Sequence, residues 1–138
     1  MELKEIYRRC GLKDPDEFKT EVITDALFSD HENVKNVIGY KRRLGKTTGI
    51  MMLGIQNLFE RKNTIIWVAN FSLVRDCHHK FLKYSSLFPE LNIWVDNNGQ
   101  FSTMSDDKRT ILKFITKHNG IPQATIGFRC DIELDDSY

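Results

Sequence analysis

The spacing of apolar side chains changes several times along the chain, and each change predicts a new element. Residues 2–10 and about 16–28 carry apolar side chains at helical spacing, and Asp14-Pro15 is a start signal for the second helix. The run 64–69 (Thr-Ile-Ile-Trp-Val-Ala) is continuously apolar, as in a strand that is buried on both faces of a parallel sheet. The pattern therefore predicts two N-terminal helices and a buried central strand.

Helical and extended patterns alternate around that strand. The other predicted elements are a strand ending at Ile38, helices at about 48–61 and 73–87, a hairpin over 91–104 with its turn at 96–99, and a strand or short helix over 109–116. Pro89 stops the second of these helices. Because strands and helices alternate after residue 36, the sequence predicts an α/β fold.

Charge and composition exclude several classes of protein. The 138 residues suffice for one domain with its own core. Lysine and arginine (20) nearly balance aspartate and glutamate (19), so any nucleic-acid contact would have to be local. The cysteines Cys10, Cys77 and Cys130 are odd in number and far apart, which argues against a disulfide framework. No apolar stretch approaches the roughly 18 residues that span a bilayer, so we expect a cytoplasmic protein without a membrane partner.

A phosphate-binding loop is predicted at 40–48, whose sequence is Tyr-Lys-Arg-Arg-Leu-Gly-Lys-Thr-Thr, because it lies between a predicted strand and a predicted helix. Backbone N–H groups and the positive end of the next helix would face the β-phosphate. The Lys46 ammonium would add a charge there, and the Thr47 hydroxyl would bind Mg²⁺. Tyr40 stands where the usual pattern has its first glycine. A basic loop that merely contains Gly-Lys-Thr is therefore the alternative.

A short apolar strand near the C-terminus ends in the acidic pair Asp135-Asp136. Nucleotide hydrolases use such a pair to place their metal and their water. Asp135 would hold Mg²⁺, directly or through a water, and Asp136 would orient or deprotonate the attacking water. Asp131 and Glu133 alternate with apolar residues, so a solvated edge strand is the competing interpretation.

These two segments resemble those of large terminases, the genome-packaging ATPases of tailed phages and related viruses. The segment 42–48 (Arg-Arg-Leu-Gly-Lys-Thr-Thr) is similar to their divergent phosphate loop, with Arg42 three residues before the Gly-Lys pair. The stretch Gly127-x-Arg129-x-Asp131 before the acidic strand is similar as well. The resemblance covers about residues 15–138, and helicases with the same core are the nearest confusable group.

The resemblance implies a role for each residue of the site. Asp136 and Arg42, as an arginine finger in cis, would be catalytic, and Thr47 and Asp135 would hold the metal. A solvated side chain is the alternative for Arg42 and for Arg43. The residues that would bind the nucleotide are Arg43, Leu44, Gly45, Lys46, Thr47 and Thr48.

The resemblance also implies cofactors and partners. It points to the ATP-binding and ATP-hydrolysing part of a viral DNA-packaging motor that acts in the host cytoplasm with ATP and Mg²⁺. Double-stranded DNA, other motor subunits and a complementary chain are its candidate partners. Two alternatives stay open: a nucleotide-binding regulator or decoy of such a motor that does not hydrolyse ATP, and a fragment of a helicase-like ATPase.

The implied fold is a single P-loop NTPase-like domain over 1–138, with a helical N-terminal segment at 1–35 and a nucleotide-binding core at 36–138. Its sheet would be mostly parallel and flanked by helices. In the family, a strand from later in the chain separates the phosphate-loop strand from the acidic strand. We therefore expect a sheet that is incomplete on its C-terminal side and an isolated chain that hydrolyses ATP slowly or not at all. A truncation, a split gene and a small rearranged relative are the competing explanations.

Two smaller expectations concern residues outside these motifs. Asn70-Phe71-Ser72 follows the central strand, where Ser72 is expected to cap the next helix, and contact with nucleic acid is the alternative. Trp67 and Trp94 are both expected in the core.

Overall fold

The computed structural model describes residues 1–13, 19–22, 34–38, 46–96, 99–105, 107–116 and 130–136. Its α-helices are α1 (Leu3–Arg9), α2 (Lys46–Phe59) and α3 (Phe71–Ser85), followed by the short 3₁₀ helix η2 (Pro89–Leu91). The described strands are β1 (Lys19–Val22), β2 (Val34–Ile38), β3 (Thr64–Val68), β4 (Trp94–Val95), β5 (Phe101–Ser105), β6 (Lys108–Thr116) and β7 (Ile132–Asp136). The α/β fold class is thus confirmed.

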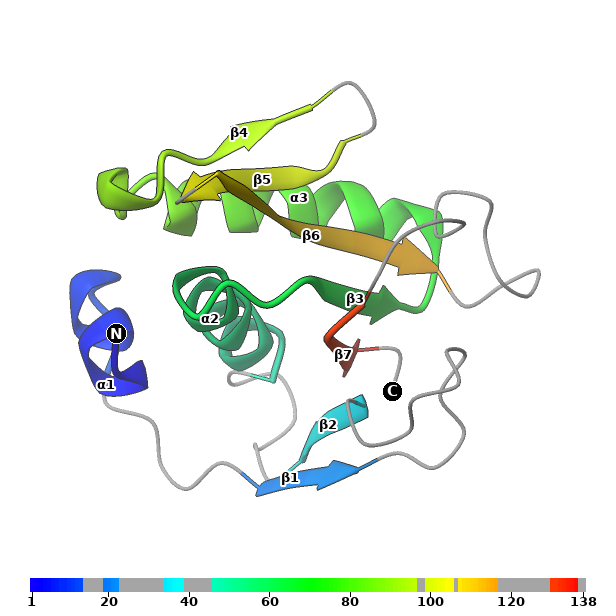
Figure 1. Cartoon of the computed structure of the whole chain (residues 1–138). Coiled ribbons are helices and arrows are strands. Elements are labelled where there is room, and N and C mark those ends of the chain that lie inside the picture. Colours follow the sequence, from blue (N-terminus) through cyan, green and yellow to red (C-terminus); the bar gives the residue numbers. More distant parts are fainter. Residues whose placement is uncertain are drawn as a thin grey trace.

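All the described strands join one sheet in the order β1-β2-β7-β3-β6-β5-β4 (Figure 1). The four neighbours β2, β7, β3 and β6 run parallel to one another. β1 pairs antiparallel with β2 at one side, and the β6-β5-β4 meander is antiparallel at the other. The sheet is therefore mixed, and the expected parallel arrangement holds only for its four middle strands.

β7 lies between β2 and β3, although it comes last in the described chain (Figure 1). Val34 and Lys35 of β2 pair with Glu133 and Leu134 of β7. The expected gap between the phosphate-loop strand and the acidic strand is therefore wrong, because β2 and β7 pair directly. Two paired strands satisfy each other's backbone N–H and C=O groups, so this part of the sheet needs no further strand to cover them.

The main core lies between the helices and one face of the sheet. Its buried side chains come from α1, α2 and α3 and from alternate positions of β3, β6 and β7, among them Ile6, Ile55, Phe81, Ile66, Leu112 and Leu134. A Cβ atom added at Gly54 would lie 2.9 Å from a methyl of Leu112 and 3.4 Å from the Phe81 ring. Gly54 therefore allows α2 to pack closely against α3 and the sheet.

The opposite face of the sheet has a smaller apolar cluster, formed by Ile65, Trp67 and Ile115 with Cys130 against it. Trp67 is 2% exposed, which confirms its expected place in the core. Trp94 is 40% exposed, so its expected place in the core is wrong. It lies on β4 at the free edge of the described sheet, where only one neighbouring strand covers it.

The predicted helix at 16–28 is wrong where the structure describes it, whereas the predicted helix at 2–10 is found as α1. Lys19–Val22 is strand β1 and pairs antiparallel with β2, whereas 14–18 and 23–33 lie outside the described residues. Thr20 and Val22 are β-branched and suit a strand. Pairing with a distant strand overrides the local helical spacing here.

The other predicted elements are found within a few residues of their expected bounds. α2, β3, α3 and the β4–β5 hairpin are all present, and 109–116 belongs to strand β6. α3 is capped by Asn70, whose Oδ1 accepts a hydrogen bond from Leu73 N at 3.1 Å. Ser72 donates to the same oxygen, so it supports the cap and is not the cap itself. Among the described helices, none combines the length and the apolar character needed to cross a membrane.

Candidate functional site

The two predicted motifs meet at Thr47 and Asp136. The Thr47 hydroxyl donates a hydrogen bond to Oδ2 of Asp136 at 3.0 Å, across 89 positions of sequence. Both side chains are half-buried. A Gly-Lys-Thr segment and an acidic strand are thus brought into direct contact by the fold.

The parallel strands explain why these two residues meet. α2 begins at Lys46, so Thr47 lies in its first turn, just beyond β2 in the chain. Asp136 pairs in register with Val68, the last residue of β3, so it lies at the carboxyl edge of the parallel strands. Open α/β sheets bind their ligands at this edge. Alternate residues of a strand face the same side. Asp136 therefore faces the same side of β7 as Leu134, whose side chain packs in the main core beneath α2.

The remaining predicted site residues are placed to different extents. Thr48 is half-buried in the first turn of α2. The backbone of Lys46 begins that helix, and the backbone of Asp135 pairs in register with Trp67. Arg42, Arg43, Leu44 and Gly45 lie outside the described residues. The structure therefore brings together Thr47 and Asp136 and places Lys46, Thr48 and Asp135 beside them in the chain.

Cys77 of α3 lies near Asp136. Burial raises the pKa of its thiol to about 11, and the negative charge of Asp136 contributes to that rise. Cys77 is 5% exposed and belongs to the main core. Asp136 therefore has α2 and α3 for neighbours, and its surroundings beneath the site are apolar.

The chemistry of the Thr47–Asp136 pair fits Mg²⁺ and phosphate. Magnesium prefers oxygen ligands and is usually held by one or two carboxylates together with waters and substrate phosphates. No group of three or more His, Cys, Asp or Glu side chains that could hold a metal occurs in the part of the chain that the structure describes. A metal at this pair would thus depend on phosphate oxygens, and the start of α2 is favourable for them because helix N-termini attract anions.

A set of polar residues behind the site was not predicted from the sequence. The indole Nε1–H of Trp67 donates to Oε1 of Glu133 at 2.7 Å, with Glu133 only 1% exposed. The backbone N–H of Asn63 donates to Oδ2 of Asp131 at 2.9 Å. Asp131 and Glu133 are therefore structural partners of β3, and the interpretation of β7 as a solvated edge strand is wrong. The one available signal was a glutamate inside an apolar strand, between Ile132 and Leu134.

Searches against protein-family models, curated proteins and solved structures gave no match to this chain. The residues and their geometry are therefore the basis for inferring a function.

Proposed function

We propose that this chain binds ATP with Mg²⁺ as the nucleotide-binding part of a viral DNA-packaging motor of the large-terminase kind. The observation that carries the proposal is the 3.0 Å contact between Thr47 Oγ1 and Asp136 Oδ2. A threonine that follows Gly-Lys at the start of a helix, next to a carboxylate at the end of a neighbouring parallel strand, is the arrangement that a Mg²⁺–nucleotide needs.

Each residue has a role in this proposal. Gly45 and Lys46 bind the β- and γ-phosphates, and Thr47 binds Mg²⁺. The contact with Thr47 favours Asp136 as the carboxylate on the metal side, a role that the sequence pattern gave to Asp135. In this proposal Asp136 is the metal ligand, and the role of orienting the attacking water is assigned to neither aspartate.

The packaging context comes from the resemblance of the two motifs to those of large terminases. In that context Arg42 would stabilise the charge on the γ-phosphate in the transition state, as arginine fingers do. Double-stranded DNA, other motor subunits and a complementary chain are the partners, and the host cytoplasm is the location. The near-neutral net charge of +1 means that DNA contact would depend on local basic residues or on those partners.

A second function is favoured by the direct pairing of β2 with β7. Large terminases have a further strand at this position, with a polar residue that senses the γ-phosphate. A chain that closes the sheet without this strand would bind nucleotide and hydrolyse it slowly or not at all. It would then regulate a complete motor instead of driving one.

Thermal unfolding with and without Mg-ATP tests the proposal. We expect the ligand to raise the melting temperature of the wild-type chain, because binding to the folded state alone stabilises it. Lys46→Ala should abolish this rise, since it removes the charge that meets the phosphates. Lys62→Ala is the matched control: it removes an exposed lysine that follows α2 at the helix's other end, and should keep the rise. Equal ATP affinity of the wild type and Lys46→Ala in calorimetry would disprove the assignment.

A further inference from the structure

The buried hydrogen bond between Trp67 and Glu133 lies on the sheet face opposite the helices. It joins Nε1 of Trp67 on β3 to Oε1 of Glu133 on β7 at 2.7 Å. Trp67 is 2% exposed and Glu133 is 1% exposed. A buried carboxylate is costly unless hydrogen bonds compensate it, so the position of Glu133 is tightly specified by its partners.

This bond runs diagonally across the two strands. In register Trp67 pairs with Asp135, so its indole reaches back two residues along β7 to Glu133. Asp136, the next residue after Asp135, is the one that contacts Thr47 on the helix-bearing face. The bond is therefore on one face of β7 and the candidate metal side chain on the other, three residues further along the strand.

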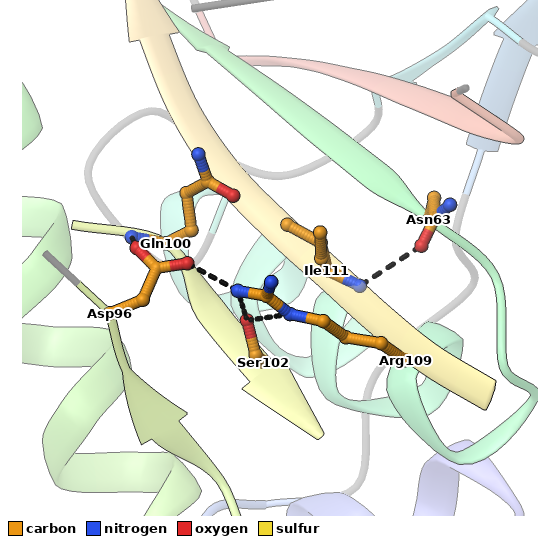
Figure 2. Close-up of polar contacts among 6 residues, drawn as sticks. All are labelled: Asn63, Asp96, Gln100, Ser102, Arg109 and Ile111. Atoms are coloured by element: carbon orange, nitrogen blue, oxygen red, sulfur yellow. Dashed lines mark hydrogen bonds and ion pairs between the residues drawn. The ribbon is translucent and has the colours of Figure 1, made fainter. Parts of the chain in front are cut away.

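A second tie holds the beginning of β7. The carbonyl of Asn63 accepts hydrogen bonds from the backbone N–H groups of Asp131 and Ile132 at 2.9 and 3.0 Å, and Asn63 N donates to the Asp131 carboxylate. The Asn63 side chain reaches the neighbouring strand, where its Oδ1 accepts from Ile111 N at 3.0 Å (Figure 2). Asn63 thus fixes the start of β7 to the start of β3 and to Ile111 within β6.

Together, the Trp67–Glu133 hydrogen bond and the hydrogen bonds of Asn63 exclude shifted registers of β7. A shift by one residue would turn the Glu133 carboxylate toward the apolar core and Asp136 away from Thr47, because alternate strand positions face opposite sides. A shift by two residues would put Asp131 or Asp135 in the place of Glu133 as the acceptor of the indole N–H, with a side chain one methylene shorter than glutamate. It would also break the pairing of Asn63 with Asp131.

We propose that Trp67 and Glu133 are positioning residues that hold β7 in the register in which Asp136 meets Thr47. This inference rests on the proposed function, because it concerns the Mg²⁺–nucleotide site formed by Thr47 and Asp136. Glu133 acts through its acceptor oxygen and not through its charge. Residues that hydrogen-bond directly to metal ligands change metal affinity by roughly 10-fold to 100-fold when they are replaced, which sets the scale for an effect that displaces Asp136 itself.

The test uses variants that separate the hydrogen bond from the charge. Trp67→Phe removes the donor, and Glu133→Met removes the acceptor without opening a cavity at the tryptophan. Glu133→Gln removes the charge but keeps an oxygen that accepts the indole N–H. Trp94→Phe is the control, because it changes the exposed tryptophan on β4. The readouts are the Mg²⁺ concentration for half-maximal ATP binding and the NMR hydrogen-exchange rates of the amides of residues 134–136.

We expect Trp67→Phe and Glu133→Met to raise the half-saturating Mg²⁺ concentration by about 10-fold or more and to speed exchange in β7. The double variant should be no worse than either single variant, because both remove the same bond. Glu133→Gln and Trp94→Phe should behave as the wild type. A merely structural role would lower the melting temperature and leave the Mg²⁺ dependence unchanged, which would overturn the proposal. Equal damage by Glu133→Gln and Glu133→Met would also overturn it, because the charge itself would then be what matters.

Failure of the proposed function gives a different result. If the wild-type chain binds no Mg-ATP, the nucleotide site is wrong, and the role of Trp67 and Glu133 in holding the register of β7 is judged by hydrogen exchange alone. Faster exchange of residues 134–136 in Trp67→Phe, with no change in Trp94→Phe, would support this role. Unchanged exchange in Trp67→Phe and Glu133→Met would refute it.

Discussion

Trp67 and Trp94 lie in the same sheet, each with a polar partner, but in opposite surroundings. Trp67 is in the middle of the sheet, 2% exposed, and its indole donates to the buried carboxylate of Glu133. Trp94 is on the edge strand, 40% exposed, with the Arg109 guanidinium 6.0 Å from its ring centre. Arg109 also pairs with Asp96 at 2.5 Å and donates to the Ser102 hydroxyl (Figure 2).

The difference shows that burial decides how strongly a polar contact constrains the pairing of the strands. A hydrogen bond sealed between two strands specifies their register, because breaking it leaves a buried polar group without a partner. An ion pair at a surface is screened by water and contributes about 0–1 kcal/mol. The Trp67 region should therefore control the candidate site, and the Trp94 region should tolerate change.

Replacing each tryptophan by alanine is the strongest test of this difference. We expect Trp67→Ala to reduce the free energy of unfolding by about 3–5 kcal/mol, since it leaves a large cavity in a packed core. Trp94→Ala should cost about 1 kcal/mol or less, because much of the ring already faces water. Urea unfolding followed by circular dichroism measures both. Similar losses for the two variants would show that β4 is as much a part of the core as β3.

The reactivity of Cys130, which packs against Trp67, probes the charge buried there. Burial raises the pKa of the Cys130 thiol to about 12, and the nearby charge of Glu133 adds to the rise. In a chain without Cys10 and Cys77, Glu133→Gln should lower this pKa and speed alkylation by iodoacetamide, because the thiolate is the reactive form. Asp131→Asn should have a smaller effect. If Glu133→Gln does not speed the alkylation of Cys130, the charge of the Glu133 carboxylate does not act on this thiol.

A pH series tests the surroundings of α3 near the edge strands, where Gly99 at the end of the β4–β5 turn lies against His78. A Cβ atom at Gly99 would lie 3.2 Å from the His78 ring, whose Nε2 is buried and has no hydrogen-bond partner among the residues that the structure describes. Burial, and then the charge of His79, lowers the pKa of His78 from its ordinary 6.5. The folded state therefore favours neutral imidazole, and its stability should fall as pH drops below that value.

Replacement of His78 is the measurement for this dependence. We expect His78→Gln to flatten the fall in stability between about pH 7 and pH 5, whereas His79→Gln on the exposed side of α3 should keep most of it. The effect should be smaller than that of Trp67→Ala. An unchanged slope in His78→Gln would assign the acid sensitivity to another group.

The smallest effect is expected at the surface ion pair. Asp96→Asn removes the charge that meets Arg109 but keeps an oxygen that can accept the Gln100 N–H at the start of β5. The loss of unfolding free energy should be at most about 1 kcal/mol and should shrink in high salt. A larger loss that does not depend on salt would mean that the hairpin is held by a desolvated pair.

Local patterns in the sequence predicted most of the fold. The apolar run at 64–69 gave β3, and the spacing around it gave α2 and α3. The failures are at positions whose partners are distant in sequence. Lys19–Val22 is a strand because β2 pairs with it, and Glu133 is buried because β7 lies between β2 and β3. Neither fact can be derived from the spacing of nearby residues.

The candidate site was predicted to a similar extent. The Gly-Lys-Thr segment and the acidic pair were identified together, and the structure places Thr47 against Asp136. Which of the two aspartates contacts Thr47 depends on the register of β7, because neighbouring strand residues face opposite sides. That register is set by Asn63 and Trp67, which no local motif connects with β7.

The contact between Thr47 and Asp136 is tested most directly by a double-mutant cycle on Mg-dependent ATP binding. Calorimetry would compare the wild type with Thr47→Val, Asp136→Asn and the double variant. If the two side chains share one magnesium ion, each single variant should weaken binding and the effects should be non-additive, with a coupling energy of about 0.5–3 kcal/mol. Additive effects, or Mg-ATP affinity that is unchanged in both single variants, would contradict a shared metal site.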